Sequence, residues 1–598
     1  MARSDFVHLH THTEYSMLDG AASNERLFAE VARQGMPAVA MTDHGNMFGA
    51  YEFFQIAKKY DGNENPLVKP IIGIEAYVAP SSRHSRKQEF WGRRRGDGGD
   101  PDVEGGKDVS GGGRYTHMTM WAKNPTGLHN LFTLSSLASY EGYYMKPRMD
   151  REIISQYNEG VIASTGCPSG EVQTRLRLGQ FDEAVETAGA YQEIFGKDHY
   201  FCELMDHGVP IERQVRSDLL RLAKKIDAPL LLTNDSHYVN EDDADAHDSL
   251  LCVGVGRNKD DPNRFRFNGS GYYIKSSDEM RSLFPDMPEA ADNTLALTEM
   301  IESYDDVFAH VDRMPQFDVP EGETQESWLR KKIAEGLDEK YGSNPPQEVL
   351  DRIDKELSVI EPLGFSSYFL VVSDICNSAR AMGVPVGPGR GSAAGSMVAY
   401  LTGIIQVNPL EHGLLFERFL NPERVNPPDI DLDFDDRQRD KVIDYVTRKY
   451  GAEYTSQVNT FGKIKAKAAV KDANRILGYP FALGDKITKA MPPDVMGKGV
   501  PLSKIFDPEH PRYAEGTEFR QLVADNPDVA KVVETARGLE GLIRGTGVHA
   551  CAFILSSAPL LDLVPMHRRD KDGMIIAGFA YPQLEEMGLM KMDFLGLR

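Results

Sequence analysis

Cysteine is scarce in this 598-residue chain, and none of its five cysteines belongs to a Cys-x-x-Cys pair. A disulfide framework or a zinc finger normally shows closely spaced, paired cysteines. The sequence therefore predicts neither. The scattered cysteines are Cys167, Cys202, Cys252, Cys376 and Cys551.

Long apolar runs are also missing. No stretch approaches the roughly 20 apolar residues of a membrane span, and residues 1–5 lack the pattern of a signal peptide. We therefore expect a cytoplasmic protein. Its length and its 41% of hydrophobic residues predict several domains with ample core.

Positive charge is in deficit, because 67 basic residues stand against 90 acidic ones and give a formal net charge of −23. Such a chain is not expected to coat nucleic acid nonspecifically, so DNA would bind in a local basic groove. One basic stripe is predicted on a helix spanning residues 465–477, where cationic side chains recur every four residues. A DNA backbone alongside and a merely solvated face are the two interpretations, and we favour DNA. The stripe consists of Lys463, Lys467, Lys471 and Arg475.

Acidic and apolar residues alternate over residues 428–434. A strand here would place Asp429, Asp431 and Asp433 on one face, with the apolar side chains facing a core. Same-face positions lie roughly 6.5–7 Å apart. Two such carboxylates can share divalent cations ~3.5–4 Å apart, as in-line phosphoryl transfer requires. The alternative is an acidic edge strand that resists aggregation.

Two other stretches contain residues that could bind phosphate or a metal ion together with the acidic strand. Residues 386–396 form a glycine-rich turn before a helix predicted over residues 397–405, and its backbone N–H groups, with Arg390 and Ser392, are suited to phosphate. The turn lacks a Walker lysine, and a plain connector is the alternative. Residues 589–597 predict an apolar strand with Lys591 and Asp593 on one face.

The first 285 residues contain a second constellation. Histidines alternate with other residues at positions 8, 10 and 12, and further His, Asp, Glu and Cys residues follow short apolar runs separated by helix-like segments. An α/β barrel gathers a site in this way at the carboxyl ends of its strands. Mixed donors of this kind suit zinc, manganese or iron better than magnesium alone.

The glycine turn, residues 416–424 (Phe-Glu-Arg-Phe-Leu-Asn-Pro-Glu-Arg), the acidic strand and residues 591–597, in this order, closely resemble the α subunits of bacterial DNA polymerase III, the C-family replicative polymerases. The resemblance covers the chain from end to end. It implies that Asp429, Asp431 and Asp593 hold the catalytic Mg²⁺ ions, with Asp433 as a neighbour. It also implies contacts to the incoming triphosphate from Arg390, Gly391, Ser392, Arg418 and Lys591.

The N-terminal pattern resembles the PHP (polymerase and histidinol phosphatase) domain. The resemblance implies a complete ligand set for Zn²⁺ or Mn²⁺ and a 3′–5′ proofreading exonuclease, with His8 outside the set. The implied ligands are His10, His12, Asp19, His44, Glu75, His117, Cys167, Asp235 and His237.

The resulting fold prediction is a multidomain α/β protein. It consists of a PHP-type α/β barrel (residues 1–285), a palm of the polymerase β-like nucleotidyltransferase type (286–460 and 547–598) and an inserted helical thumb (461–546). Residues 81–114 are predicted to be a mobile surface loop. By resemblance, fingers and C-terminal domains are absent, so we expect this truncated chain to polymerise poorly or not at all alone.

The implied partners are primer-template DNA, deoxynucleoside triphosphates and, in the full-length protein, a sliding clamp and a τ-type clamp-loader subunit. Two other hypotheses remain open: a PHP-type phosphoesterase that acts on small substrates, and a PHP domain that is only a metal-stabilised scaffold.

Overall fold

The computed structural model describes residues 4–92, 110–423, 428 and 430–597. The chain forms two compact units. Unit 1 comprises Met1–Phe308, Phe461–Gly547 and Pro565–Asp570, and unit 2 comprises Ala309–Thr460, Val548–Val564 and Lys571–Arg598. The predicted thumb therefore belongs to the same compact unit as the predicted barrel.

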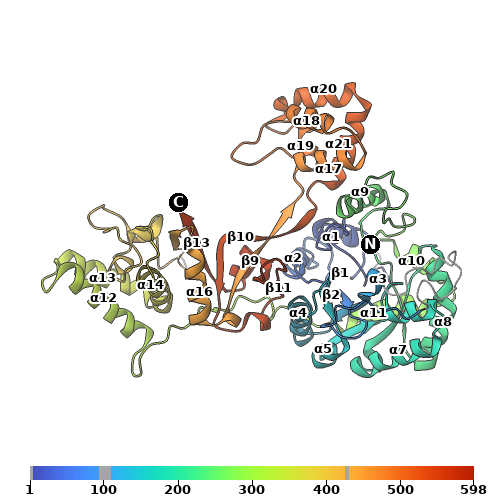
Figure 1. Ribbon diagram of the computed structural model, residues 1–598, viewed down its shortest axis with the longest axis horizontal. Helices are drawn as coiled ribbons and strands as arrows, with labels where there is room; N and C mark the ends of the chain where they lie inside the picture. The colour runs from blue at the N-terminus through green and yellow to red at the C-terminus, as the bar shows by residue number, and fades with distance from the viewer. Residues whose placement is uncertain (1–3, 93–109, 424–427, 429, 598) are drawn as a thin grey trace. The chain divides into compact units, whose positions relative to one another are not determined.

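Unit 1 is built on a seven-stranded sheet in the order β1-β2-β3-β5-β6-β7, with β4 paired to β2. Neighbouring strands run parallel, except that β3 is antiparallel to both β2 and β5. Figure 1 shows helices of this unit surrounding its strands, so the α/β class is confirmed. The strands are β1 (Ala38–His44), β2 (Lys69–Val78), β3 (Thr116–Ala122), β4 (Arg148–Met149), β5 (Val161–Ser164), β6 (Tyr200–Leu204) and β7 (Leu230–Leu232).

The N-terminal segment connects the two edges of this sheet. On one side the amide of Ala40 in β1 donates to the carbonyl of His8 at 2.9 Å. On the other side the amide of His12 donates to Ser236, just after β7, at 2.7 Å, and the amide of Ser236 donates to His10 at 3.1 Å. The segment thus brings the ends of β1 and β7 to the same place.

The helices of unit 1 pack their apolar faces on the sheet and on one another. Local signals start several of them: Asn124 and Pro125 begin α4, and Ser276 with Glu279 forms a capping box at α10. These helices are α1 (Asn24–Arg33), α2 (Ala50–Ala57), α3 (Ser110–Gly113), α4 (Pro125–Tyr140), α5 (Arg151–Gln156), α6 (Glu171–Arg177), α7 (Phe181–Phe195), α8 (Pro210–Ile226), α9 (Ala244–Val255), α10 (Ser277–Leu283) and α11 (Pro288–Met300).

Residues 461–547 form a helical cluster (Figure 1) whose core is continuous with α9. Val470 and Val533 belong to the same buried apolar cluster as Leu250 and Val253 of α9. A small strand, β11 (Met566–Arg568), also joins unit 1, where the amide of Met566 donates to Ser136 in α4 at 2.8 Å. The cluster comprises α17 (Ala466–Ile476), α18 (Phe481–Ala490), α19 (Leu502–Ile505), α20 (Thr517–Asp525) and α21 (Pro527–Leu539).

Unit 2 is a mixed sheet with helices, in the strand order β12-β9-β10-β13-β8. Ile430, Leu432 and Phe434 are buried in its core, as the alternation of the acidic strand predicts. The strands are β8 (Asp431–Asp435), β9 (Thr455–Lys463), β10 (Ile543–Leu555), β12 (Ile575–Ala580) and β13 (Met590–Leu597); β9 and β10 continue into unit 1. The helices are α12 (Gln325–Tyr341), α13 (Gln347–Ile360), α14 (Ser366–Ala381), α15 (Met397–Leu401), α16 (Arg439–Tyr450) and α22 (Tyr581–Glu586).

Two local predictions need correction. The helix predicted over residues 397–405 is only the short α15, because Thr402 and Gly403 end it and Gly403 has a positive φ of 78°. The predicted loop of residues 81–114 is described only outside 93–109, and its first part is packed: the Arg83 side chain is 10% exposed and contacts Asp150 at 3.1 Å.

Candidate functional site

All nine predicted ligands of the barrel come together in unit 1. His44 ends β1, Glu75 lies in β2, Cys167 follows β5, and Asp235 and His237 follow β7. His10 and His12 come from the N-terminal segment. We call this group the nine-residue cluster: His10, His12, Asp19, His44, Glu75, His117, Cys167, Asp235 and His237.

The direction of β3 explains the position of His117. Because β3 runs antiparallel to β2, its beginning, rather than its end, lies beside the ends of the parallel strands. In the register of the two strands His117 is opposite Tyr77, two residues after Glu75. A ligand at the start of an antiparallel strand thus joins ligands at the ends of parallel ones.

Two carboxylates organise the cluster. Glu75 is 1% exposed. Its Oε2 lies 2.6 Å from Nδ1 of His44, and its Oε1 lies 3.0 Å from Nδ1 of His117. Asp235 Oδ1 lies 3.1 Å from Nε2 of His12 and 3.3 Å from Nε2 of His10. The backbone of Asp235 has a positive φ of 41°, an uncommon conformation for a non-glycine residue that is found more often at functional sites.

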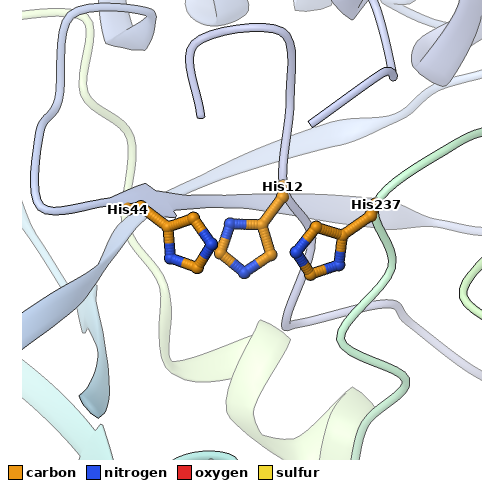
Figure 2. A group of neighbouring side chains, drawn as sticks. All are labelled: His12, His44 and His237. Carbon is orange, nitrogen blue, oxygen red and sulfur yellow. The ribbon is translucent and has the colours of Figure 1, made fainter. Parts of the chain in front are cut away.

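Three imidazoles lie next to one another in Figure 2, each carried by a different segment. The ring centroids of His12 and His44 are 4.0 Å apart, and those of His12 and His237 are 4.2 Å apart. Asp19 adds a carboxylate 3.0 Å from Nε2 of His44, and the thiol of Cys167 lies 3.6 Å from Nδ1 of His117. Nitrogen, oxygen and sulfur donors therefore converge on one small volume.

The cluster fits a metal centre. Within the described residues, several of its buried polar atoms have no hydrogen-bond partner, although a buried polar group normally has one. Three of its subsets also have donor atoms close enough together to share one ion. The donor types suit Zn²⁺ or Mn²⁺. The atoms without a partner in hydrogen-bonding geometry include Nε2 of His10, His12 and His237, Oδ1 of Asp19 and Asp235, and both oxygens of Glu75, whose contacts with imidazole nitrogens are ion pairs.

The histidines of the cluster differ in pKa and therefore in protonation state. Burial would lower the pKa of His44, but the carboxylates of Glu75 and Asp19 outweigh burial and raise it to about 10. For His10 the carboxylates of Glu203 and Asp235 likewise outweigh burial and raise the pKa. For His12 burial and the charge of His44 prevail, and the pKa falls to about 4. At neutral pH His10 and His44 therefore carry protons that a cation would have to displace.

Glu203 in β6 supports the cluster and was not among the predicted residues. Its Oε1 lies 2.6 Å from Nδ1 of His10 and accepts the hydroxyl of Thr233 at 2.7 Å, while Oε2 accepts the hydroxyls of Thr119 and Ser164. A carboxylate held in this way fixes the orientation of the imidazole and presents Nε2 to the centre. The available signal was a lone acidic residue inside an otherwise apolar strand.

His247 of α9 is a second residue that the sequence analysis missed. It is 2% exposed, and its Nε2 lies 3.9 Å from Oδ1 of Asp19. His8, by contrast, lies outside the cluster as predicted, with its Nε2 2.8 Å from the carbonyl oxygen of Lys275.

A second set of charged side chains gathers in unit 2. The parallel pairing of β8 and β13 puts Asp431 in register with Asp593. Arg390 lies 2.8 Å from Asp431 and 3.1 Å from Asp433, and Lys591 lies 2.7 Å from Asp593. We call these five residues the palm cluster. Asp429, the third predicted catalytic aspartate, lies outside the described residues.

The glycine-rich turn lies against these carboxylates. A Cβ atom on Gly387 would be 2.8 Å from Cβ of Asp433, so only glycine allows this approach. Gly391 has a positive φ of 66°, and a Cβ there would be 3.9 Å from Asp431 Oδ2. Ser392 begins the 3₁₀ helix Ser392–Gly395 that follows.

A buried carboxylate anchors the end of that turn. Glu356 of α13 is fully buried and accepts the amides of Met397 and Val398 at 2.8 and 3.0 Å, and the hydroxyl of Ser396 at 2.8 Å. Arg352 completes the set by donating to Glu356 at 2.8 Å. The carboxylate thus satisfies the amides at the start of α15 and holds the turn in place.

Arg418 and the basic stripe are not part of the palm cluster. Arg418 is exposed at the end of the 3₁₀ helix Phe416–Arg418, and the described residues give it no ion pair. The stripe is shorter than predicted, because α17 begins at Ala466 and Lys463 lies on β9. Three of its cations already have acidic partners: Lys463 with Glu14, Lys467 with Asp494 and Lys471 with Asp485, and only Arg475 lacks an ion pair within the described chain.

Among the described residues, no helix combines the length and the apolar character that a membrane crossing requires.

Comparisons with known proteins match both halves of the chain. Residues 8–207 match the family described as PHP domain, and residues 327–596 match the family described as Bacterial DNA polymerase III alpha NTPase domain. The chain is 58% identical to DNA polymerase III subunit alpha of Saccharopolyspora erythraea over 595 residues, which is 99% of this chain and 49% of that protein. It is 55% identical to the protein of the same name from Mycobacterium tuberculosis, over 100% of this chain and 50% of that protein.

A solved structure is also similar: an amidohydrolase from Chromobacterium violaceum, at 14% identity and a TM-score of 0.24, covering 40% of this chain and 89% of that one. The two family matches define a PHP domain and a polymerase α NTPase domain in one chain. The chain belongs to the bacterial DNA polymerase III α family. It spans about half the length of the curated relatives that it matches.

Replacing Glu203 with Gln should weaken Mn²⁺ or Zn²⁺ binding by about 10–100-fold, because the neutral amide no longer fixes and polarises His10. Titration of the metal-free protein with each ion would measure this. Glu212→Gln is a matched control, since Glu212 is a buried carboxylate 2.6 Å from Nδ1 of His207, which lies outside the cluster. Equal affinities for the two variants would contradict the assigned role of Glu203.

Metal binding should release protons and should strengthen as pH rises. His44, with a pKa of about 10, and His10, with a raised pKa, are protonated at neutral pH and must each lose the proton from a ligand nitrogen. His12 and His237, with pKa values of about 4, are already neutral. Burial also raises the pKa of the Cys167 thiol, which must lose its proton to act as a ligand. Calorimetry in buffers of different ionisation enthalpy should therefore report release of about three protons at pH 7. A pH-independent affinity between neutrality and pH 9 would refute this assignment.

Proposed function

We propose that this chain carries the nucleotidyl-transfer centre of a replicative DNA polymerase, with the nine-residue cluster acting as a 3′–5′ proofreading exonuclease. The pairing of Asp431 with Asp593 across two parallel strands is the observation that carries the first part. Two facing carboxylates with a lysine and an arginine beside them are what binding of a metal-bound triphosphate requires. The family membership of the chain supports the same reaction.

We assign a separate role to each side chain of the palm cluster. Asp431 and Asp593, together with Asp429, would hold Mg²⁺, which when bound lowers the pKa of the primer hydroxyl and neutralises pyrophosphate. Arg390 is half exposed and can exchange its carboxylate partners for phosphate oxygens. Lys591 lies over the ring of Tyr581 at 4.1 Å, which directs its ammonium group. The assignment of the polymerase β-like palm, and of a thumb in residues 461–546, belongs to this proposal.

The exonuclease assignment is based on the chemistry of the nine-residue cluster. Its histidines and carboxylates would hold Zn²⁺ or Mn²⁺, which when bound supplies an ionised water and neutralises a departing oxygen. Glu203 keeps His10 oriented, and Ser16, hydrogen-bonded to both Asp43 and His12, does the same for His12. Phosphodiester hydrolysis is the reaction that such a set of donors is suited to perform.

Replacing Asp593 with Asn should weaken Mg²⁺-dependent binding of a deoxynucleoside triphosphate at least about tenfold, because one of the charges that hold the cation is lost. Asp435→Asn is the matched control, since this carboxylate lies on the same strand as Asp431 but is paired with Arg437 at 2.9 Å. Binding would be measured with a fluorescent nucleotide analogue. If both variants bind as the unmodified chain does, the palm cluster is not the nucleotide site.

With Mn²⁺ or Zn²⁺ added, the chain should shorten 5′-labelled single-stranded DNA stepwise from its 3′ end, and Asp235→Asn should reduce this to background. Asp206→Asn is the control, because Asp206 follows β6 but is paired with Arg216 outside the cluster.

Two outcomes would favour the alternatives. No shortening by a chain shown to bind metal would leave the nine-residue cluster as a structural support. Preference for a generic phosphate ester over the oligonucleotide would favour a small-substrate phosphoesterase.

A further inference from the structure

Arginine and phenylalanine alternate in residues 264–267, beside the nine-residue cluster. Phe265 is 56% exposed, unusual for so large an apolar side chain. Arg266 is exposed as well, whereas Arg264 and Phe267 are partly buried. Basic residues interleaved with aromatic ones are typical of surfaces that bind single-stranded nucleic acid.

Arg264 and Arg266 have different roles. The guanidinium of Arg264 donates to both oxygens of Asp248, at 2.7 and 2.8 Å, and to the carbonyl of Lys259 at 3.0 Å, so it anchors the segment. Arg266 has neither an ion pair nor a hydrogen bond within the part of the chain that the structure describes. The nearby carboxylate of Asp245 is paired with Lys259 at 2.6 Å. Arg266 therefore offers an uncompensated positive charge at the surface of an acidic protein.

An aromatic series leads from this surface to the cluster. The ring centroids of Phe265 and Phe267 are 5.7 Å apart, and Phe267 lies 4.6 Å from the ring of His237 and 5.0 Å from that of His247. The exposed ring of Phe265 is thus only one side chain away from a predicted metal ligand.

A cavity of about 550 Å³ lies beside this segment. Its lining includes Arg266, Phe267 and Asn268 from the segment, together with Tyr238 and His247. The volume falls within the range of roughly 300–1,000 Å³ found for ligand pockets. The charges of the two aspartates in its wall, Asp245 and Asp248, are compensated by Lys259 and Arg264.

We propose that Phe265 and Arg266 form a platform for the 3′-terminal nucleotides of single-stranded DNA. Phe265 stacks on a base, Arg266 binds the adjacent phosphate, and the cavity beside Phe267 receives the end of the strand next to the nine-residue cluster. This platform would deliver single-stranded DNA to the proposed exonuclease, so its biological role rests on the proposed function. DNA binding by the platform can be tested without exonuclease activity.

The test is DNA binding by a chain that cannot cut. In the Asp235→Asn background, an oligothymidylate with 2-aminopurine next to its 3′ end should lose fluorescence on binding, because the base stacks. Phe265→Ala should abolish this quenching and weaken binding about tenfold, whereas Phe265→Trp should retain both. Arg266→Gln should weaken binding and lower the slope of log affinity against log salt by about 0.7.

Two controls match these variants in exposure. Leu67→Ala removes an apolar side chain that is 60% exposed, and Arg33→Gln removes an arginine that is 68% exposed and paired with Glu30. Both should bind and quench like the parent. Unchanged quenching and affinity in Phe265→Ala and Arg266→Gln would overturn the platform, even if the unmodified chain degrades DNA. Loss of quenching in those variants would support the platform, even if the unmodified chain never shortens DNA.

Discussion

The buried carboxylate of Glu75 is the constraint on which the nine-residue cluster depends. An ionised carboxylate removed from water costs several kcal/mol unless compensating charges surround it. Here burial would raise the pKa of Glu75, but the neighbouring His117 and His44 outweigh burial and hold it well below its usual range. Imidazoles must therefore converge on this strand, and the N-terminal segment that joins β1 to the end of β7 brings two of them.

The sequence predicted the ligands better than their support. Glu75 and Asp235 follow short apolar runs and His10 lies in an alternating histidine stretch, and the resemblance to PHP domains selected them as the predicted ligands. Glu203 and His247 become adjacent to the cluster only when β6 and α9 are packed, so the lone acidic residue in β6 did not reveal that its partner is His10. The DNA-binding role of the basic stripe stays a prediction: spacing along a helix places cations on one face, but it does not show that acidic residues from other segments already pair with two of them.

The fold predictions also succeeded where a periodic local pattern decides the structure and failed where a helix end or distant contacts decide it. The alternation in residues 428–434 correctly places the apolar side chains inside, because period two is a property of the strand itself. The predicted length of α15 was wrong at its end, because Thr402 and Gly403, with its positive φ of 78°, stop the helix after Leu401. By contrast, the association of residues 461–547 with α9 depends on apolar residues whose partners are distant in sequence.

The two clusters meet the same electrostatic problem in different ways. The nine-residue cluster surrounds buried carboxylates with histidines from several segments of unit 1. The palm cluster places Arg390 and Lys591 against Asp431, Asp433 and Asp593, and the arginine is half exposed. A ligand that brings both cations and phosphate can satisfy the carboxylates and the arginine together, because each exchanges one partner for another of the same charge. Under the proposed function, the palm cluster suits a substrate that arrives and leaves, and the nine-residue cluster suits ions that stay bound.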